Sequence, residues 1–137
     1  MIEGYTISTD KAKLDIDGIH DFLSTRSCWA KGRTRETVLK SIENSLCFGV
    51  YDERGKLVAF ARVVTDCAVF AFLMDVFVLE TYRGRGLGKK LMDYIMQYPP
   101  LQGLKRWQLG TNDAHGLYRR YGFKELAAPE RHMEKVE

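Results

Sequence analysis

The strongest constraint on the fold is a junction in the middle of the chain, where an apolar run meets a glycine-rich basic segment. Val69–Leu79, "VFAFLMDVFVL", is almost continuously apolar, which is typical of a central strand covered on both faces. The segment "YRGRGLGKK" begins soon after it, and Leu87, Leu91 and Ile95 then recur at helical spacing. The sequence therefore predicts a strand, a glycine loop and a helix in direct succession.

Such a loop is suited to holding an anion at the first turn of a helix. Gly86 and Gly88 allow a diphosphate to approach the main chain, and the helix N-terminus adds partial positive charge. The helix dipole contributes only about 0.3–1 kcal/mol toward an exposed anion. Several backbone amides and the side chains of Arg83 and Arg85 would therefore share the binding. The alternative is a glycine-rich helix start surrounded by solvated cations.

Two common phosphate loops do not fit this segment. A Walker A loop requires a second glycine five residues after the first, followed by Lys-Ser/Thr. Lys89 stands five residues after Gly84, and Leu91 follows Lys90. A dinucleotide-binding loop requires a third glycine three residues after the second, and Lys89 or Leu91 occupies that place. Both classes of nucleotide site are therefore excluded.

The remaining patterns predict a mixed α/β domain around this junction. Apolar residues at helical spacing occur between residues 16 and 23 and between 38 and 46, while Gly55 in "DERG" suits a hairpin turn. The order is β-α-α-β-β-β-α-β-α-β within one domain, residues 1–137. The predicted strands are 5–9, 46–51, 56–65, 69–79, 106–111 and 131–136, with a short helix in 113–123.

Composition excludes several functional classes. The net charge is only +3, and no stripe of basic and aromatic residues is present, so nucleic-acid binding is not expected. Cys28, Cys47 and Cys67 have neither CxxC nor matching His spacing, so neither a metal site nor a disulfide framework is expected. The N-terminus lacks a signal-peptide pattern and no apolar run could span a bilayer. We therefore expect a cytoplasmic protein without a membrane partner.

Two motifs together resemble a known family. Arg83–Gly88 fits R/Q-x-x-G-x-G/A and resembles motif A of the GNAT (Gcn5-related) N-acetyltransferases. The longer segment "MDVFVLETYRGRGLGKKLM" is similar to the strand, loop and helix of that motif, and "AHGLYRRYGF" is similar to the family's later A-x-x-L-Y-x-x-x-G-F segment. The resemblance covers roughly the last half of the chain. It implies a GNAT-like α/β fold with a mixed, mostly antiparallel central sheet flanked by helices.

The resemblance implies an acetyl-CoA-dependent N-acetyltransferase. Its cosubstrate would be acetyl-CoA, and the acetyl group would pass directly to a primary amine of a small molecule or a protein. A non-catalytic acyl-CoA sensor or interaction module would keep the same loop and is the alternative. The sequence leaves both a monomer and a homodimer open. The residues that the resemblance assigns to the cofactor are Phe77, Val78, Arg83, Gly84, Arg85, Gly86, Leu87, Gly88, Lys89 and Asn112.

The resemblance also indicates how the reaction would be catalysed. The amide of Val78 would face the thioester carbonyl. Tyr118 stands where the family has a general-acid tyrosine. The alternative for Tyr118 is a structural position in the core. Asp75 is the only acid inside the apolar strand, so it is predicted as a base acting directly or through water. A hydrogen-bonded structural carboxylate is the alternative for Asp75. The family's best-known base is a glutamate earlier on this strand, where this sequence has Phe72 or Leu73.

The outer site residues have more than one interpretation. Asn112 would contact the cofactor arm, although Asn112 or Asp113 could instead cap the following helix. His115 is a weaker candidate for the base, because an exposed helix position explains it as well. Trp29 and Arg26 lie in the loop between the first two helices, which shapes the acceptor site in the family, so they are predicted to contact the substrate.

Overall fold

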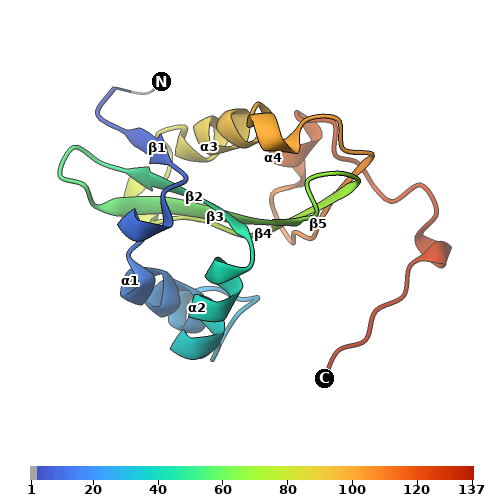
Figure 1. Ribbon diagram of the computed structural model, residues 1–137, viewed down its shortest axis with the longest axis horizontal. Coiled ribbons are helices and arrows are strands. Elements are labelled where there is room, and N and C mark those ends of the chain that lie inside the picture. The colour runs from blue at the N-terminus through green and yellow to red at the C-terminus, as the bar shows by residue number, and fades with distance from the viewer. Residues whose placement is uncertain (1–2) are drawn as a thin grey trace.

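Five strands form one sheet in sequence order, which confirms the predicted mixed α/β fold (Figure 1). The structure is a computed structural model that describes residues 3–137. The first three strand pairings are antiparallel, whereas β5 runs parallel to β4. The strands are β1 (Thr6–Ser8), β2 (Leu46–Tyr51), β3 (Leu57–Thr65), β4 (Phe70–Val78) and β5 (Arg106–Leu109).

Helices cover both faces of this sheet (Figure 1). The helices α1 (Ile16–Asp21), which continues into a π-helical turn (Phe22–Arg26), and α2 (Arg35–Glu43) lie on one face. The helices α3 (Leu87–Met96) and α4 (His115–Arg119) lie on the other. Short 3-10 turns occupy Lys11–Lys13, Glu80–Tyr82, Pro99–Leu101 and Pro129–Arg131. Over residues 3–137, every helix is too short or too polar to cross a membrane.

The sequence determines where several of these elements begin and turn. The side chain of Asp15 accepts a hydrogen bond from the Gly18 amide and caps α1, and Thr34 caps α2 through the Thr37 amide. Between β2 and β3, Gly55 has a φ of +81°, as the predicted hairpin requires. These local signals fix the entry angles of elements whose apolar faces then pack on the sheet.

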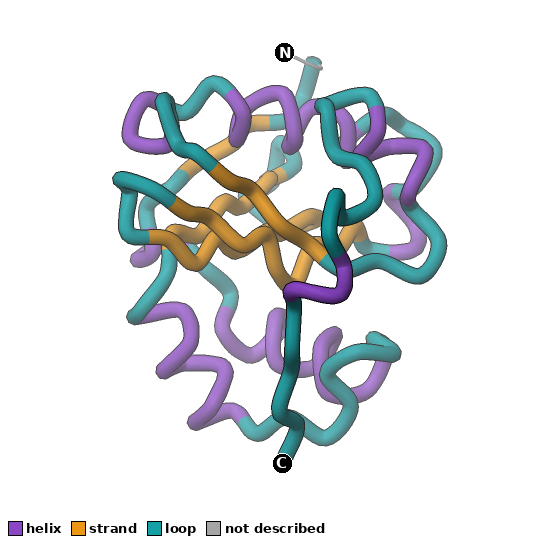
Figure 2. The backbone as a smooth tube through the Cα atoms, turned by 90° about the vertical axis from the view of Figure 1, so that its right-hand side faces the viewer, coloured by secondary structure: helices purple, strands orange, loops and turns teal. Residues whose placement is uncertain are grey.

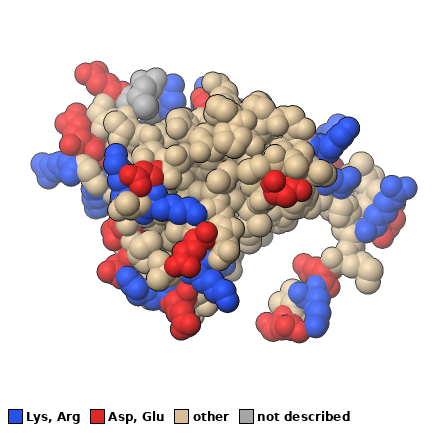
Figure 3. Space-filling view, viewed as in Figure 1, with Lys and Arg blue, Asp and Glu red and all other residues tan. Residues whose placement is uncertain are grey.

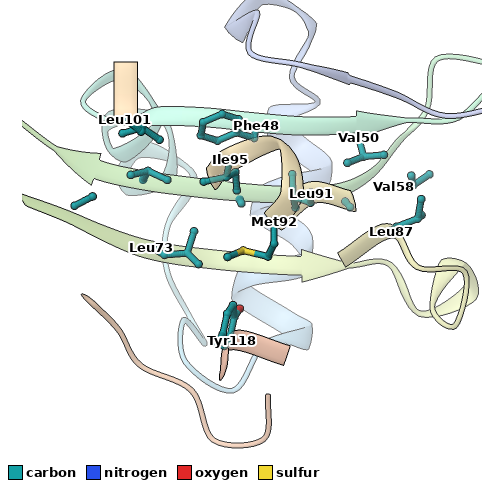
Figure 4. Close-up of a cluster of buried hydrophobic side chains, with 14 residues drawn as sticks. Phe48, Val50, Val58, Leu73, Leu87, Leu91, Met92, Ile95, Leu101 and Tyr118 are labelled. Atoms are coloured by element: carbon teal, nitrogen blue, oxygen red, sulfur yellow. The ribbon is translucent and has the colours of Figure 1, made fainter. Parts of the chain in front are cut away.

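Each face of the sheet has its own buried core. On the α3 side, Leu91, Met92 and Ile95 descend from the helix onto Phe48 and Leu73 of the sheet (Figure 4). On the α1 and α2 side, the buried residues are Ile19, Phe22, Leu23, Val38, Ile42, Phe60 and Phe77. β3 and β4 contribute to both cores, which explains why their sequences are apolar almost throughout.

The final strand that the sequence predicts at 131–136 does not form. Residues 132–137 follow a short turn as an extended segment that pairs with no strand of the described chain (Figure 2). The side chain of Met133 is 98% exposed and that of Val136 is 83% exposed. A strand-like sequence forms a strand only where a neighbouring edge accepts its hydrogen bonds, and here no edge of the same sheet does so.

Gly49 provides a test of packing between β2 and the core on the α1 and α2 side of the sheet. A Cβ atom at this position would lie 2.7 Å from Oη of Tyr51 and 3.0 Å from Cδ1 of Leu57, both buried. We expect Gly49→Ala to lower the free energy of unfolding by about 1–3 kcal/mol through overpacking. Gly116→Ala is the control, because its Cβ would meet no atom within 4 Å and Gly116 lies in α4. Urea unfolding of both variants measures the difference, and equal stabilities would contradict this packing.

Candidate active site

The glycine loop between β4 and α3 offers consecutive unpaired backbone amides. Gly84 and Gly86 both have a φ of +79°, a conformation that residues with side chains rarely adopt. Within the described chain, no backbone amide from Gly84 to Lys89 donates a hydrogen bond, as is usual for the first turn of a helix. A Cβ atom at Gly84 or Gly88 would meet nothing within 4 Å. The loop therefore presents backbone N–H groups without hydrogen-bond acceptors beside unfilled space at Gly84 and Gly88.

Two arginines of this loop are held in place beside it. Arg83 donates from Nε to the carbonyl oxygen of Val78 over 3.0 Å. Arg85 donates from Nη1 to the hydroxyl of Tyr5 over 2.7 Å, and its guanidinium lies 5.1 Å from the centre of the Tyr82 ring. α3 has no acidic residue in its first turn. Positive charge and free amides are therefore concentrated at the same end of α3.

β4 loses its neighbour halfway along its length. The parallel ladder joins Phe70–Leu73 of β4 to Arg106–Leu109 of β5 and then stops, although β4 continues to Val78. Within residues 3–137, one edge of β4 therefore has no strand partner from residue 74 to residue 78, beside the glycine loop. An extended ligand arm can pair with such an edge as an additional strand would.

A β-bulge lies at the point where the two strands part. On β3 only Ala61 separates Phe60 from Arg62, whereas Asp75 and Val76 separate their partners on β4. Asp75 has a φ of +53°, which is uncommon for a residue other than glycine and tolerated best by Asn and Asp. The extra residue bends β4 and increases its twist, which directs the second half of β4 away from β5.

The bulge also determines which backbone groups face the opening. The amide of Leu79 donates to the carbonyl of Val58 on β3 over 2.9 Å. Because backbone groups alternate in direction along a strand, those of Phe77 face β3 and those of Val76 and Val78 face the open side. The side chain of Phe77 stacks on Phe22 at 4.1 Å between ring centres. Of the predicted cofactor contacts on β4, Val78 thus has the suitable backbone direction and Phe77 does not.

The carboxylate of Asp75 is buried, and both of its oxygens accept hydrogen bonds. Its side chain is only 1% exposed. Oδ1 accepts from Nε1 of Trp29 at 3.0 Å, while Oδ2 accepts from Nη1 of Arg33 at 2.8 Å and from Nε of Arg62 at 2.9 Å. Two of these three donors are guanidinium groups, whose hydrogen bonds to a carboxylate are among the strong ones in proteins. This geometry favours the structural interpretation of Asp75 over that of a proton acceptor.

Tyr118 is buried on α4 and directs its ring toward β4 (Figure 4). Burial raises the pKa of the Tyr118 phenol, with a further contribution from the charge of Asp113. Its ring packs edge-on against Phe123 at 6.0 Å between centres. Tyr121, one residue beyond α4 and its cap, differs in that its hydroxyl donates to Asp93 at 2.6 Å. Among described residues the Tyr118 hydroxyl has no such protein partner, which leaves it available to a ligand.

The start of α4 differs from the predicted cap. Ala114 is the N-cap residue, and its amide donates to Oγ1 of Thr111 over 3.1 Å. Neither Asn112 nor Asp113 caps the helix, so that alternative for Asn112 was wrong. Instead, Nδ2 of Asn112 lies 3.8 Å from Sγ of Cys28. Asn112 therefore joins the end of β5 to the loop between α1 and α2.

The two predicted substrate contacts lie in different surroundings. Trp29 is 49% exposed, although its indole nitrogen reaches the buried Asp75. Arg26 is paired with Glu80 at 2.9 Å and lies over the Phe22 ring at 4.9 Å. Trp29 can therefore form a wall beside the bulge, whereas the charge of Arg26 is already matched by a neighbouring carboxylate. His115 is exposed at the first position of α4. His115 and Tyr118 both line an open hollow between β5, α4 and the C-terminal segment.

Sequence reasoning missed the two arginines that hold Asp75. Arg62 is the single charged residue between Leu57 and Thr65, and its side chain is only 9% exposed. A buried charge requires a partner, so Arg62 and Asp75 on adjacent apolar strands could have been paired from the sequence. Arg33 carried no comparable signal, because it lies in a polar loop.

Comparison with known proteins gives a consistent match over this region. Residues 43–125 match the family described as acetyltransferase (GNAT) domain. A Gibberella zeae protein assigned to the acetyltransferases is 30% identical over 135 residues, which covers 83% of this chain and 75% of that protein.

Solved structures of other proteins also match this chain. A Xanthomonas campestris pv. campestris protein assigned to the GNAT family is 50% identical with a TM-score of 0.94, covering 97% of this chain and 93% of that chain. A Mycobacterium tuberculosis protein solved in complex with CoA is 20% identical with a TM-score of 0.72, covering 88% and 72% of the two chains. At that identity the likeness shows a shared fold, and the CoA belongs to the other protein.

Removal of the Asp75 carboxylate separates its two interpretations. Asp75→Ala leaves the guanidinium groups of Arg33 and Arg62 without their partner, so we expect a loss of about 3–5 kcal/mol in the free energy of unfolding. Glu80→Ala breaks only the exposed pair with Arg26 and should cost at most about 1 kcal/mol. Chemical unfolding of both variants gives these values. An Asp75→Ala protein as stable as the wild type would contradict the structural role and favour the base.

Proposed function

Because the chain belongs to the GNAT acetyltransferase family, we propose that it transfers the acetyl group of acetyl-CoA directly to a primary amine. The observation that carries the proposal is the juxtaposition of an open β4 edge and a loop of unpaired amides. A long ligand with a diphosphate at one end of an extended amide-containing arm fits both features at once. The acceptor amine belongs to a small molecule or a protein.

The residues present fit the two parts of acetyl-CoA. The free amides from Gly84 to Lys89 would hold the diphosphate at the start of α3, where the helix dipole favours an anion. Arg83, Arg85 and the exposed Lys89 would add positive charge around it. The backbone groups of Val76 would pair with the pantetheine arm, since the carbonyl of Val78 already accepts from Nε of Arg83. Phe77 contributes to this site by packing against Phe22 rather than by touching the ligand.

Two groups of the chain would stabilise the charges that develop during transfer. The Val78 amide would donate to the thioester oxygen as it becomes an oxyanion. Tyr118 would then donate its proton to the departing CoA thiolate. The raised pKa of the Tyr118 phenol keeps that proton in place at neutral pH, so the donor is present in its protonated form.

The acceptor side of the site would be walled by the loop between α1 and α2. Asp75 anchors Trp29 and Arg33 of that loop to the bulge. Asn112, at the end of β5, contacts Cys28 of the same loop. We assign Asp75 as a positioning residue for this wall. The amine would lose its proton to water, because the two oxygens of Asp75 are already engaged.

A non-catalytic acyl-CoA sensor would use the same loop but would not require a free phenol at Tyr118. Release of the CoA thiol in the presence of a panel of amines separates the two functions. Continuous turnover with any amine supports the enzyme, whereas binding without thiol release across the panel supports the sensor.

Substitution of Gly88 tests the diphosphate site. A Cβ atom there would meet nothing within 4 Å, so a valine side chain would enter the open space beside the free amides. In the wild type, acetyl-CoA at a hundredfold excess over its Kd should stabilise the fold by about 2.7 kcal/mol. We expect Gly88→Val to lose most of this stabilisation while unfolding at nearly the wild-type temperature without ligand. Thermal shift assays with acetyl-CoA, ATP and NAD measure it. Equal responses to all three in the wild type would refute the assigned ligand.

Substitution of Tyr118 tests the proton donor. Tyr118→Phe keeps the packing on Phe123 and removes the hydroxyl, so we expect single-turnover transfer to fall by about 10²–10⁴-fold. The Kd for acetyl-CoA should change little. Tyr121→Phe is the matched control, because the Tyr121 hydroxyl is engaged by Asp93 and its pKa is raised to about 12. A Tyr118→Phe rate within threefold of the wild type would show that the acid lies elsewhere.

A further inference from the structure

The ion cluster around Asp75 carries more positive than negative charge. The guanidinium groups of Arg33 and Arg62 both donate to the one carboxyl group of Asp75, and among residues 3–137 neither forms another ion pair. By contrast, Arg26 of the same layer is matched by Glu80. Because an arginine side chain does not lose its proton in proteins, at least one positive charge of the cluster has no counterion in the described chain.

Part of each guanidinium group is also free to bind. Arg33 uses Nη1 for Asp75, whereas Arg62 uses Nε for Asp75 and Nη2 for Sδ of Met74 at 3.5 Å. The other nitrogens, Nε and Nη2 of Arg33 and Nη1 of Arg62, donate to no atom of residues 3–137. In that part of the chain the Tyr51 hydroxyl is the single buried side-chain nitrogen or oxygen without a hydrogen-bond partner, so the free nitrogens of both arginines reach solvent. Arg62 thus presents a donor to the surface although its side chain is only 9% exposed.

An apolar surface lies next to these donors. Along β4, Ala71 and Leu73 belong to the core under α3, whereas the alternating Phe72 and Met74 are half-buried and belong to neither core. Side chains alternate between the faces of a strand, so Phe72 and Met74 lie on the face that α1 and α2 cover elsewhere. We call these two residues the apolar shelf. The space-filling view shows open space on this side of the sheet, between the α1 and α2 layer and the end of the C-terminal segment (Figure 3).

The shelf and the free donors border the path assigned to the cofactor arm. Asp75, which holds both arginines, directly precedes Val76, whose backbone would pair with the pantetheine. The half-exposed Trp29 donates to the same carboxyl group and adds an aromatic surface. A molecule on the shelf would therefore meet apolar side chains and unmatched positive charge together, beside the position of the thioester.

We propose that the acceptor is an α-amino acid with an apolar side chain, whose carboxylate is bound by Arg33 and Arg62. This assignment rests on the proposed acetyl transfer and narrows its acceptor to a small molecule, because the N-terminus of a protein has no carboxylate beside its amine. The carboxylate supplies the missing negative charge through charge-assisted hydrogen bonds, and its side chain packs on the shelf. The amine exchanges one hydrogen for the acetyl group as the C–S bond breaks and a C–N bond forms. That hydrogen balances the thiol of CoA, and the product is the N-acetylated amino acid.

Three amines of similar shape test the carboxylate site: L-phenylalanine, L-phenylalaninamide and 2-phenylethylamine. We expect kcat/KM for L-phenylalanine to exceed that for the other two by about 10–100-fold, as is typical of hydrogen bonds to a charged group. Amine reactivity does not explain such a preference over the amide, because the amine of the amide loses its proton more easily than that of the amino acid. Equal kcat/KM values for the three amines would overturn this acceptor while leaving acetyl transfer intact.

Substitution of Arg33 connects the preference to the structure. Arg33→Gln should raise KM for L-phenylalanine by about 10–100-fold with little effect on 2-phenylethylamine, whose turnover shows that the variant is folded. Arg33→Lys keeps the charge and should restore part of the preference. Arg35→Gln is the matched control, because Arg35 forms an exposed pair with Asp17 at 2.7 Å and should leave the preference unchanged. An Arg33→Gln protein with the wild-type preference would overturn the assignment.

The indole N–H of Trp29 reports the site without any turnover. It donates to Asp75, so a carboxylate bound to the same arginines should shift its ¹H–¹⁵N resonance, which a Trp29→Phe spectrum distinguishes from that of Trp107. L-phenylalanine should shift this resonance and 2-phenylethylamine should not, in titrations run with and without CoA. That result without turnover of any amine would refute acetyl transfer and still support the carboxylate site. Absence of a shift in both titrations, or equal shifts with the two amines, would overturn the carboxylate site.

Discussion

Three hydrogen bonds on the Asp75 carboxylate tie together two strands and a loop that are far apart in the sequence. Arg62 belongs to β3, Asp75 to the bulge of β4, and Trp29 and Arg33 to the loop between α1 and α2. Asp75 occupies a left-handed backbone conformation, which costs a residue with a side chain about 1–3 kcal/mol. The buried ion pairs hold the chain in that conformation, and the bulge in turn directs the end of β4 away from β5.

The opening beside β4 depends on this bulge, and the remaining parts of the candidate site surround the opening. The glycine loop lies at its far end, Tyr118 approaches from α4, and Trp29 lies on the opposite layer. Tyr118 is held by the core on the α3 side, and Trp29 is held by its hydrogen bond to the buried Asp75. Fixed positions of this kind suit a reaction that depends on precise placement of a thioester and an amine.

The sequence predicted those parts of this arrangement that follow from local patterns. The apolar run of β4, the glycines at positive φ and the hairpin at Gly55 each have a direct physical signature. The bulge had none, because it results from a mismatch of register between β3 and β4. Arg62 could have been paired with Asp75 from the sequence, whereas Arg33 could not, because it lies in a polar loop that meets Asp75 only through the tertiary fold. The predicted strand at 131–136 did not form, because strand formation depends on pairing and residues 132–137 pair with neither edge of the sheet.

The most direct test of the account is to map the binding of coenzyme A on the backbone amides of the ¹⁵N-labelled protein by NMR. The opening beside β4 and the free amides of the loop should together form the binding site. We therefore expect the largest amide shifts from Gly84 to Lys89 and at Val76 and Val78, with little change at Asp66 or Cys67, which lie in the turn between β3 and β4 at the other end of β4. Shifts confined to residues outside the loop and the second half of β4 would contradict the account.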